Sequence, residues 1–327
     1  MKSSIIFIFV GLAVCHALID DWQGFKTSFG KTYEHPKEEL FRRKVYEENL
    51  KWIEKHNALF KQGLVSYELK MNKYGDLTED EFRMAFLSTN MSQLLTADGT
   101  PFTMPADVGD IPDSYDWRDL KAVTPVKDQG MCGSCWAFST IGSLESINFR
   151  KTSHLVRLSE QQLVDCSTSK YDNYGCNGGL PERAYQYIKD VGGVDTEESY
   201  PYKAADRKCS FDKTKVGAKI TGIVKTKKGD ENALKAAVAT AGPVSVCIDV
   251  TNNFRFYSKG VFKDKTCSSS SINHAVLVVG YGTENGEDYW LVKNSWGTSW
   301  GDKGYIKMAR NRKNQCAIAP FAVYPTV

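Results

Sequence analysis

The sequence contains little proline, 10 residues in 327, and its one long apolar run lies at the extreme N-terminus. With 42% hydrophobic and 12% aromatic residues, the scarcity of proline argues against a disordered or fibrous chain. The lack of a second apolar run argues against a membrane-spanning protein. The 42 basic and 39 acidic residues are interspersed, so the chain also lacks the basic patch of a nucleic-acid-binding protein. These absences leave a soluble chain that is long enough for two modest domains.

The N-terminus has the three parts of a secretory signal peptide. Lys2 precedes the apolar run from Ile5 to Val14, and small residues follow near Ala17. This order predicts a signal peptide over residues 1–17, with Leu18 as the new N-terminus; a buried core helix is the alternative. The chain would then enter the oxidising secretory pathway, where disulfides persist. Of the nine cysteines, eight remain after this segment is removed.

Residues 18–110 differ from the remainder in their secondary-structure pattern and in charge. Apolar residues at three- to five-residue steps among many charges predict mostly amphipathic helix over residues 20–87. The composition of residues 88–110 predicts a linker, in which Asn90 begins the glycan acceptor sequence Asn-Met-Ser. Residues 1–110 hold 13 basic and 16 acidic residues, which leaves 29 basic and 23 acidic residues in the rest of the chain. Opposite net charges predict two parts that can lie against each other.

The pattern after residue 110 is helical first and strand-like afterwards. Helices are predicted over residues 134–148 and 159–166, the second opening with a capping-box-like pattern at Ser159. Strands separated by glycine-bearing turns are predicted over residues 244–250, 274–281, 289–293 and 305–309. This order indicates an α+β fold with a helical half and a β half.

Cys132 and Cys135 lie two residues apart, a spacing with three common interpretations. A zinc ligand pair needs a second close pair, but Cys166 and Cys176 are separated by nine residues. A thioredoxin-like redox pair belongs in a βαβ pattern, which the sequence does not have. The third interpretation is one bridged cysteine beside a nucleophile at a helix start, where the helix dipole favours thiolate.

A cysteine nucleophile needs a base and a group that orients the base. His274 stands 139 residues after Cys135, and Asn294 stands 20 residues further on. A lone histidine at the head of a strand is more often structural than catalytic, so the assignment depends on the neighbouring motifs.

These motifs give the chain a resemblance to the papain-like cysteine peptidases, and among them to cathepsin L-type endopeptidases. The signature Cys-Gly-Ser/Ala-Cys-Trp/Tyr is present from Cys132 to Trp136. The spacing to His274 fits the family range, and Asn294 lies slightly beyond it. The resemblance covers nearly the whole chain. It implies a papain-like two-domain fold, with a helical left domain and a β-barrel-like right domain, preceded by a helical inhibitory prosegment.

The resemblance assigns the catalytic roles residue by residue. Cys135 corresponds to the nucleophile and His274 to its proton partner, together forming a thiolate–imidazolium pair. Asn294 corresponds to the residue that orients the imidazole. Gln129 corresponds to the side-chain donor of the oxyanion hole, acting with the Cys135 backbone N–H. Trp296 corresponds to the indole that shields the His–Asn bond. Cys135 is expected on one wall of the interdomain cleft, and His274 and Asn294 on the other.

Six cysteines allow 15 pairings, and the resemblance selects one. It implies the disulfides Cys132–Cys176, Cys166–Cys209 and Cys267–Cys316. Cys247 is then left unpaired, and a buried inert thiol is its simplest interpretation.

The resemblance also implies a pocket for the second substrate residue before the scissile bond. Its expected lining is Leu180, Pro181, Cys247, Ile272 and Phe321, each of which could equally be core packing. These side chains predict apolar walls with no charge and a shallow floor at Phe321, favouring Leu and Val over Phe or Trp. Asn273 departs from the family pattern, because cathepsin L-type enzymes often have Asp immediately before the catalytic histidine.

The N-terminal part matches the family's inhibitory prosegment. Its helical motif corresponds to Glu39, Arg43, Tyr46, Asn49, Ile53 and Asn57, and its second motif to Asn72, Tyr74 and Asp76. Lys70 replaces the usual glycine of that second motif, and Tyr74 replaces a phenylalanine. The resemblance implies three segments: a signal peptide (1–17), an inhibitory propeptide (18–110) and a mature peptidase domain (111–327), which starts at Ile111.

The predicted function is hydrolysis of peptide bonds in proteins by a cysteine endopeptidase, made as an inactive zymogen and activated by acid removal of the prosegment. No metal or organic cofactor is expected. The expected partners are protein and peptide substrates, the chain's own propeptide and cystatin-like inhibitors, with no nucleic acid, no membrane span and a monomeric state. The expected location is the lysosome or the extracellular space, including a digestive lumen. A non-catalytic storage or binding homologue, and a prosegment that inhibits proteases in trans, are the alternatives.

Overall fold

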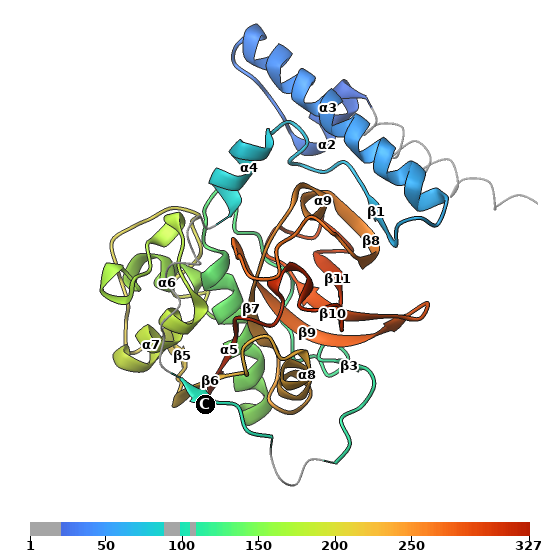
Figure 1. The fold of residues 1–327 in the computed structure, drawn as a ribbon. Helices are drawn as coiled ribbons and strands as arrows, with labels where there is room; N and C mark the ends of the chain where they lie inside the picture. Colours follow the sequence, from blue (N-terminus) through green and yellow to red (C-terminus); the bar gives the residue numbers. More distant parts are fainter. Residues whose placement is uncertain (1–20, 88–98, 105–108) are drawn as a thin grey trace, which may run out of the picture.

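The computed structural model describes residues 21–87, 99–104 and 109–327 (Figure 1). The expected signal peptide and Asn90 lie outside these ranges. Within them, no helix is both long enough and apolar enough to cross a membrane.

The N-terminal part is mostly helical, and its buried aromatic side chains belong to the main hydrophobic cluster of the protein. It contains α2 (Trp22–Phe29), α3 (Pro36–Lys61), β1 (Tyr67–Leu69) and α4 (Glu79–Phe86). The rings of Trp22 and Phe25 lie 5.5 and 4.8 Å from that of Tyr46 on α3, which fixes α2 against α3. A capping box between Thr78 and Glu81 starts α4.

The helical half of the remainder is built around α5. It contains α5 (Cys135–Thr152), α6 (Glu160–Cys166) and α7 (Pro181–Val191), with two short 3₁₀ turns at Ser169–Tyr171 and Gly175–Asn177 and a small sheet of β4 (Val194–Asp195) and β5 (Val216–Ala218). From Cys135 to Asn148, every residue of α5 is buried. A helix that is buried on all sides is a core helix, so α5 fixes the position of its first residue, Cys135.

The β half is one sheet of mostly antiparallel strands. Its strands are β2 (Thr100–Pro101), β3 (Tyr115–Asp116), β6 (Gly222–Lys225), β7 (Val244–Ile248), β8 (Tyr257–Phe262), β9 (His274–Glu284), β10 (Glu287–Lys293), β11 (Tyr305–Ala309) and β12 (Ala322–Thr326), joined by β1. The order is β1-β8-β11-β10-β9-β7-β12-β6-β2, with β3 paired to β9. The helices α8 (Glu231–Thr240) and α9 (Asn252–Arg255) and a 3₁₀ turn at Gln315–Ala317 complete this half.

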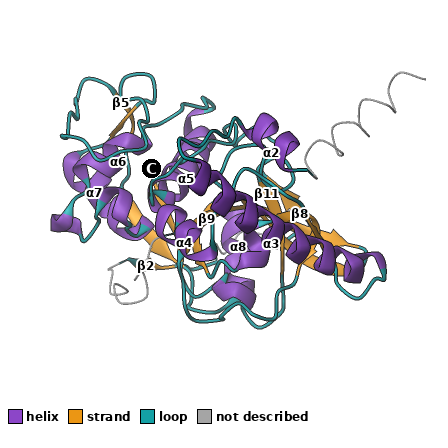
Figure 2. Ribbon diagram, turned by 90° about the horizontal axis from the view of Figure 1, so that it is seen from above, coloured by secondary structure: helices purple, strands orange, loops and turns teal. Residues whose placement is uncertain are grey.

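The sheet is open over the described residues, since its two end strands, β1 and β2, do not pair with each other. The expected α+β architecture is confirmed, but the expected barrel-like half is a twisted open sheet (Figures 1 and 2). Both end strands come from the N-terminal part: β1 pairs with β8, and β2 pairs with β6. The prosegment therefore covers both open edges of the sheet, a common protection for unpaired strands.

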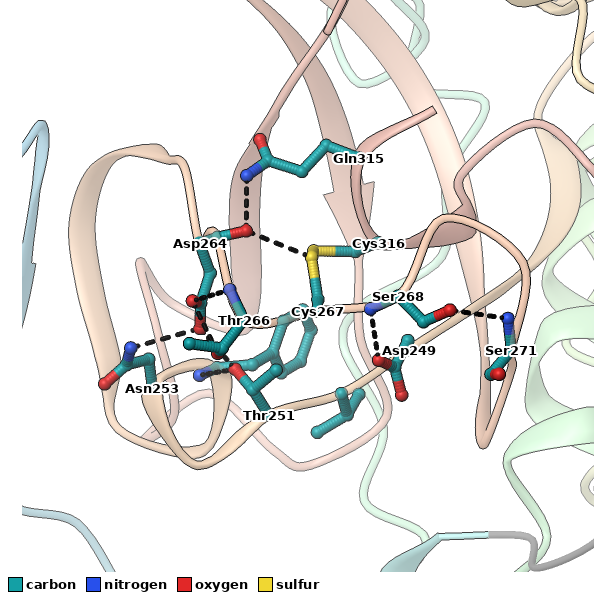
Figure 3. Close-up of a disulfide and its surroundings, with 12 residues drawn as sticks. Asp249, Thr251, Asn253, Asp264, Thr266, Cys267, Ser268, Ser271, Gln315 and Cys316 are labelled. Carbon is teal, nitrogen blue, oxygen red and sulfur yellow. Dashed lines mark hydrogen bonds between the residues drawn. A yellow bond between two sulfur atoms is a disulfide. The ribbon is translucent and has the colours of Figure 1, made fainter. Parts of the chain in front are cut away.

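Three disulfides join Cys132 to Cys176, Cys166 to Cys209 and Cys267 to Cys316. These are the pairs that the resemblance implies. The first two lie in the helical half, and the third joins the loop after β8 to the 3₁₀ turn before β12 (Figure 3). Cys135 and Cys247 lie outside these disulfides, and both are buried.

Candidate active site

Cys135 is the first residue of α5, and its thiol is completely buried. The backbone N–H of Ala275 donates to its Sγ across 3.4 Å, so the thiol lies directly beside the start of β9. The carbonyl of Cys176 accepts a hydrogen bond of 2.8 Å from the Gly133 N–H, next to the Cys132–Cys176 disulfide. Both features hold the turn before α5, and the positive end of the helix favours a thiolate at Cys135.

His274 opens β9 and contacts Asn294, which follows β10. His274 Nε2 and Asn294 Oδ1 are 2.9 Å apart, and the same oxygen accepts a 2.8 Å hydrogen bond from the Ser295 N–H. Because this oxygen only accepts, Nε2 carries the ring hydrogen of a neutral His274. Nδ1 is then the nitrogen with a free lone pair, and no described residue is hydrogen-bonded to it. The geometry leaves Nδ1 as the atom that can take a proton.

The environment of His274 is apolar. The ring of Trp296 lies 4.8 Å from the imidazole and is itself fully buried. Burial lowers the pKa of His274 to about 4, while the hydrogen bond to Asn294 raises it. In this proform the imidazole is therefore neutral near pH 7.

Gln129 is completely buried beside these groups. Its Oε1 accepts a 2.7 Å hydrogen bond from the Ser295 hydroxyl, which fixes the orientation of the amide. Its Nε2 donates to the carbonyl of Cys132 at 2.8 Å and to the carbonyl of Phe86 at 3.2 Å. Phe86 belongs to the prosegment helix α4, so a prosegment carbonyl occupies the donor expected to serve the oxyanion hole.

Aromatic side chains of the prosegment cover the site. The rings of Tyr74 and Phe82 contact Trp296 edge-on at 5.8 and 5.2 Å. Phe86 packs on Tyr74 at 4.7 Å, and the following residue, Leu87, is buried. This cluster excludes water from the catalytic groups and blocks access to them.

One arginine of the β half anchors the same prosegment segment. Arg255 is 0% exposed and donates hydrogen bonds to the backbone carbonyls of Tyr74 and Leu77. Its guanidinium lies 5.0 Å from the ring of Phe82 and 4.5 Å from that of Phe256. Burial lowers the pKa of Arg255 to about 10, so it remains charged.

A buried cluster of charges lies behind the site. Lys127 Nζ bonds to Glu145 at 2.9 Å and to Glu160 at 2.6 Å, and Lys293 Nζ donates to the Thr124 carbonyl at 2.7 Å. Burial raises the pKa of Glu160 to about 8 and lowers that of Lys293 to about 8. Lys127 lies two residues before Gln129, Glu145 lies on the helix of Cys135, and Lys293 precedes Asn294. The cluster thus links the segments that carry the catalytic side chains.

Four of the five residues assigned to the substrate pocket line one cavity of about 220 Å³: Leu180, Pro181, Cys247 and Phe321. Ile272 is not part of this lining; it is buried in the surrounding core cluster. The expected absence of charge is wrong, because Glu182, Lys225 and Lys228 also line the cavity. Sequence reasoning missed them because the resemblance assigned only Leu180 and Pro181 in this segment and not the next residue, Glu182. The two lysines lie far away in the chain, Lys225 at the end of β6 and Lys228 just beyond it.

Among the described residues, no three His, Cys, Asp or Glu side chains are grouped so that they could hold a metal ion.

Sequence reasoning also missed Ser295 and Arg255. Ser295 had a signal, since it follows Asn294 directly. Arg255 had none, because its burial depends on a prosegment loop about 180 residues earlier in the chain.

Comparison with known proteins agrees with this geometry. Residues 111–326 match the model of the papain family cysteine proteases, and residues 22–82 match that of the cathepsin propeptide inhibitor domain. The chain is 54% identical over 319 residues to "Cathepsin L1" of Drosophila melanogaster, covering 95% of this chain and 85% of that protein. It is 50% identical over 328 residues to "Digestive cysteine proteinase 1" of Homarus americanus, covering 100% of both.

A solved structure of digestive procathepsin L 3 from the Tenebrio molitor larval midgut superposes with a TM-score of 0.86 at 42% identity. The match covers 95% of this chain and 99% of that one. The chain therefore belongs to the papain family of cysteine proteases, as a cathepsin L-like endopeptidase zymogen that carries its own propeptide inhibitor domain.

Proposed function

We propose that Cys135, His274, Asn294 and Gln129 carry out peptide bond hydrolysis in this endopeptidase. The observation that carries the proposal is the Gln129 amide, whose Nε2 donates to the Phe86 carbonyl at 3.2 Å. A substrate carbonyl in that position would lie beside the thiol of Cys135 at the start of α5. The prosegment then inhibits by placing one of its own carbonyls at the donor.

The reaction follows from the positions of the hydrogens. His274 Nδ1 takes the proton of Cys135, and the thiolate attacks the peptide carbonyl carbon. The oxyanion accepts hydrogen bonds from Gln129 Nε2 and from the backbone N–H of Cys135. The imidazolium returns its proton to the leaving amine as the C–N bond breaks. Water, deprotonated by the same imidazole, then hydrolyses the thioester and regenerates the thiol.

Epoxide labelling together with a peptide hydrolysis assay separates this assignment from a non-catalytic homologue. The protein is labelled with a thiol-reactive epoxide before and after incubation at pH 4.5, and the processed protein is assayed for peptide hydrolysis. We expect labelling of Cys135 only after the prosegment is released, and none in the Cys135→Ser variant. Labelling without peptide hydrolysis by the processed protein would contradict the proposed function.

We also propose the division into a signal peptide (1–17), a propeptide (18–110) and a mature domain (111–327). Support comes from the packing at the junction. Ile111 packs against the main hydrophobic core, and the Tyr281 hydroxyl donates to the Pro112 carbonyl at 3.0 Å. N-terminal sequencing of the processed enzyme tests the boundary.

Further proposals concern placement and partners. Localisation in a lysosome or a digestive lumen is in keeping with relatives named as cathepsins and digestive proteinases. Glycosylation at Asn90, inhibition by cystatin-like proteins and a monomeric mature enzyme remain predictions from the sequence. Immunolocalisation, glycosidase digestion and size-exclusion chromatography test them in turn.

A further inference from the structure

The loop after β4 places a tyrosine hydroxyl between the two segments that are proposed to form the oxyanion hole. The Tyr202 hydroxyl donates a 2.8 Å hydrogen bond to the backbone carbonyl of Gln129. It also lies 2.6 Å from the hydroxyl of Ser134, the residue directly before Cys135. One side chain therefore connects the segment of Gln129 to the start of α5.

The direction of these two hydrogen bonds follows from the atoms that take part. A backbone carbonyl can only accept, so the single hydrogen of the Tyr202 hydroxyl points to Gln129. Ser134 is then the donor to the Tyr202 oxygen. Burial raises the pKa of the Tyr202 hydroxyl, which therefore keeps its hydrogen in acid and at neutral pH.

The bond to Tyr202 also explains an unusual helix start. Ser134 is the N-cap residue of α5, and the side chain of an N-cap serine usually accepts a hydrogen bond from a backbone N–H of the first turn. The Ser134 side chain makes no such capping bond, and its hydroxyl bonds to Tyr202 instead. The position of the first turn of α5 is thus tied to that of the Gln129 carbonyl.

Tyr202 is itself held in place. Its backbone N–H donates to Glu197 Oε1 at 3.1 Å, and the N–H of the next residue, Lys203, donates to Gln161 Oε1 at 2.7 Å. Its ring packs edge-on against that of Phe138 on α5, at 4.8 Å. A hydroxyl whose backbone and ring are both anchored can fix its own partner in turn.

The backbone of Gln129 is held at both of its polar atoms. Its N–H donates to the Ser295 carbonyl at 2.8 Å, and its carbonyl accepts from Tyr202. Ser295 lies in the β half and Tyr202 in the helical half, so each half fixes one of the two atoms. Because the side-chain amide of Gln129 is aimed only as precisely as its backbone is placed, both bonds bear on the oxyanion hole.

We propose that Tyr202 is a positioning residue of the reaction, whose hydroxyl holds the Gln129 amide in the geometry that stabilises the oxyanion. It touches no reacting atom and acts through Gln129. The inference rests on the proposed function, in which Gln129 Nε2 is the side-chain donor to the oxyanion.

The test is a double-mutant cycle on the processed enzyme with Tyr202→Phe and Gln129→Ala. Tyr202→Phe removes one hydroxyl and keeps the ring against Phe138. We expect it to lower kcat by about tenfold with little change in KM, because a misplaced donor weakens binding of the transition state alone. In the Gln129→Ala background it should lower kcat by less than about twofold, because the amide that it positions is absent. Epoxide labelling of Cys135 counts the active sites, so a loss of folded enzyme does not appear as a loss in kcat.

Tyr200→Phe is the matched control, because this tyrosine lies in the same loop. Its hydroxyl donates to Asp165 Oδ2 at 2.8 Å and accepts from the Ser210 N–H at 3.0 Å, and both partners lie outside the two segments of the oxyanion hole. Tyr200→Phe should leave kcat per labelled site unchanged.

Ser134→Ala provides a second variant, which removes only the donor to Tyr202. It should lower kcat by a smaller factor than Tyr202→Phe, and again only where Gln129 is present. An equal fall in kcat for Tyr202→Phe with and without Gln129, or no fall in either background, would overturn the inference and leave the proposed function standing. If Gln129→Ala itself leaves kcat unchanged, the role proposed for Gln129 fails and the inference fails with it.

Discussion

At the residue scale, Asn273, which precedes His274, bonds to the partly buried carboxylate of Asp249. Its Oδ1 accepts from the Val250 N–H at 2.8 Å, and its Nδ2 donates to Asp249 Oδ1 at 2.9 Å. The other oxygen of Asp249 accepts from the Ser268 N–H at 2.6 Å (Figure 3). Burial raises the pKa of Asp249. The amide of Asn273 therefore donates a hydrogen bond to the Asp249 carboxylate, which an ionised acid at position 273 could not do.

We predict that Asn273→Asp destabilises the protein near neutral pH. Two carboxyl groups within hydrogen-bond distance cannot both ionise, so the pKa of one rises above its unfolded value. A raised carboxyl pKa stabilises the fold only at low pH, and that contribution is lost as the pH rises. Thermal unfolding at pH 4.5 and pH 7 should show a larger loss at pH 7. The double variant Asp249→Asn/Asn273→Asp should recover it, and an equal loss at both pH values would contradict this account.

The same substitution bears on activity. A carboxylate beside His274 would stabilise the imidazolium and move the alkaline limb of kcat/KM to higher pH. Since Asp249 would hold the new acid partly protonated, the full movement should occur only in the double variant. A pH profile of both variants distinguishes these cases.

Gln129 gives a second prediction. Gln129→Ala removes the proposed side-chain donor of the oxyanion hole and should lower kcat by roughly 10²–10³, with little change in KM. Ser295→Ala, which only frees the Gln129 amide to turn, should cost less. Steady-state kinetics of the two processed variants provides the comparison, and a drop confined to KM would exclude a role for Gln129 in the transition state.

At the element scale, α5 determines how the two halves fit together. It presents Cys135 at its first turn and Glu145 three turns later, where the Glu145 carboxylate meets Lys127 and accepts from the Thr124 hydroxyl at 2.5 Å and the Leu158 N–H at 2.9 Å. All three hydrogen-bonding groups come from segments outside the helix. Glu145 thus fixes α5 along its own axis.

We predict that Glu145→Ala is strongly destabilising. It leaves Lys127 buried with Glu160 as its only charged partner among the described residues, and breaking a buried ion pair typically costs about 3–5 kcal/mol. Replacing all three charges by apolar residues, in Lys127→Met/Glu145→Leu/Glu160→Leu, should cost less than Glu145→Ala alone. Urea unfolding of the Cys135→Ser background measures both, and a larger loss in the triple variant would contradict the argument.

Long elements were predictable from sequence, and short ones were not. The helix from Cys135 and the strands β7, β9, β10 and β11 each follow a periodicity over several turns or alternations. Strands β1 and β2 have three and two residues, too few for any period to appear. Helix α7 was not predicted, although it has a start signal in Pro181 at its first position and a stop signal in Gly192, with φ +90°, after its end.

The residues proposed as catalytic could be singled out from the sequence because a short motif carries each of them. Cys135, His274 and Asn294 sit in recognisable local sequences, and their distances in space add little to that assignment. Arg255 has no such motif, since its contacts with Tyr74 and Leu77 come from a part of the chain that only folding brings near. The lysines that line the substrate pocket were missed for the same reason.

At the scale of the whole molecule, net charge describes the prosegment interface poorly. The prosegment is acidic and the enzyme basic, yet the cross-interface ion pairs run both ways: Glu68 of the prosegment pairs with Lys259, and Lys73 pairs with Asp128. The most deeply buried charge at the interface, Arg255, binds neutral carbonyls. The predicted release of the prosegment in acid should therefore depend on individual carboxylates more than on overall attraction.

Glu81 is one such carboxylate. Although partial burial would raise its pKa, the hydrogen bond to Arg42 lowers it below the usual 4.5. A lowered pKa stabilises the folded prosegment above that pH and ceases to do so as acid protonates the group. We predict slow self-processing near pH 4–5, and a flatter pH dependence in Glu81→Gln. Processing of the wild type at equal rates at pH 7 and pH 4.5 would refute this.

Arg255 should behave differently, since backbone carbonyls do not titrate. We predict that Arg255→Leu speeds epoxide labelling of Cys135 in the zymogen by about tenfold at every pH, because two buried carbonyls lose their donor. The shape of the pH profile of the labelling rate should be the same as in the wild type. The labelling rate of Arg255→Lys, which keeps one donor, should fall between those of Arg255→Leu and the wild type.

The strand β2 gives the prosegment a second attachment point, on β6, well along the chain from α4. The Phe102 N–H donates to the Lys225 carbonyl at 2.7 Å there, while Phe86 meets Gln129 at the other point. Because the two attachment points lie on one chain, each raises the effective concentration of the other. After one cut between α4 and β2, β2 stays covalently joined to the peptidase domain, and the piece that carries α2, α3 and α4 becomes a separate molecule. That piece would then bind by its own contacts alone, so inhibition would become dependent on concentration and would be lost on dilution.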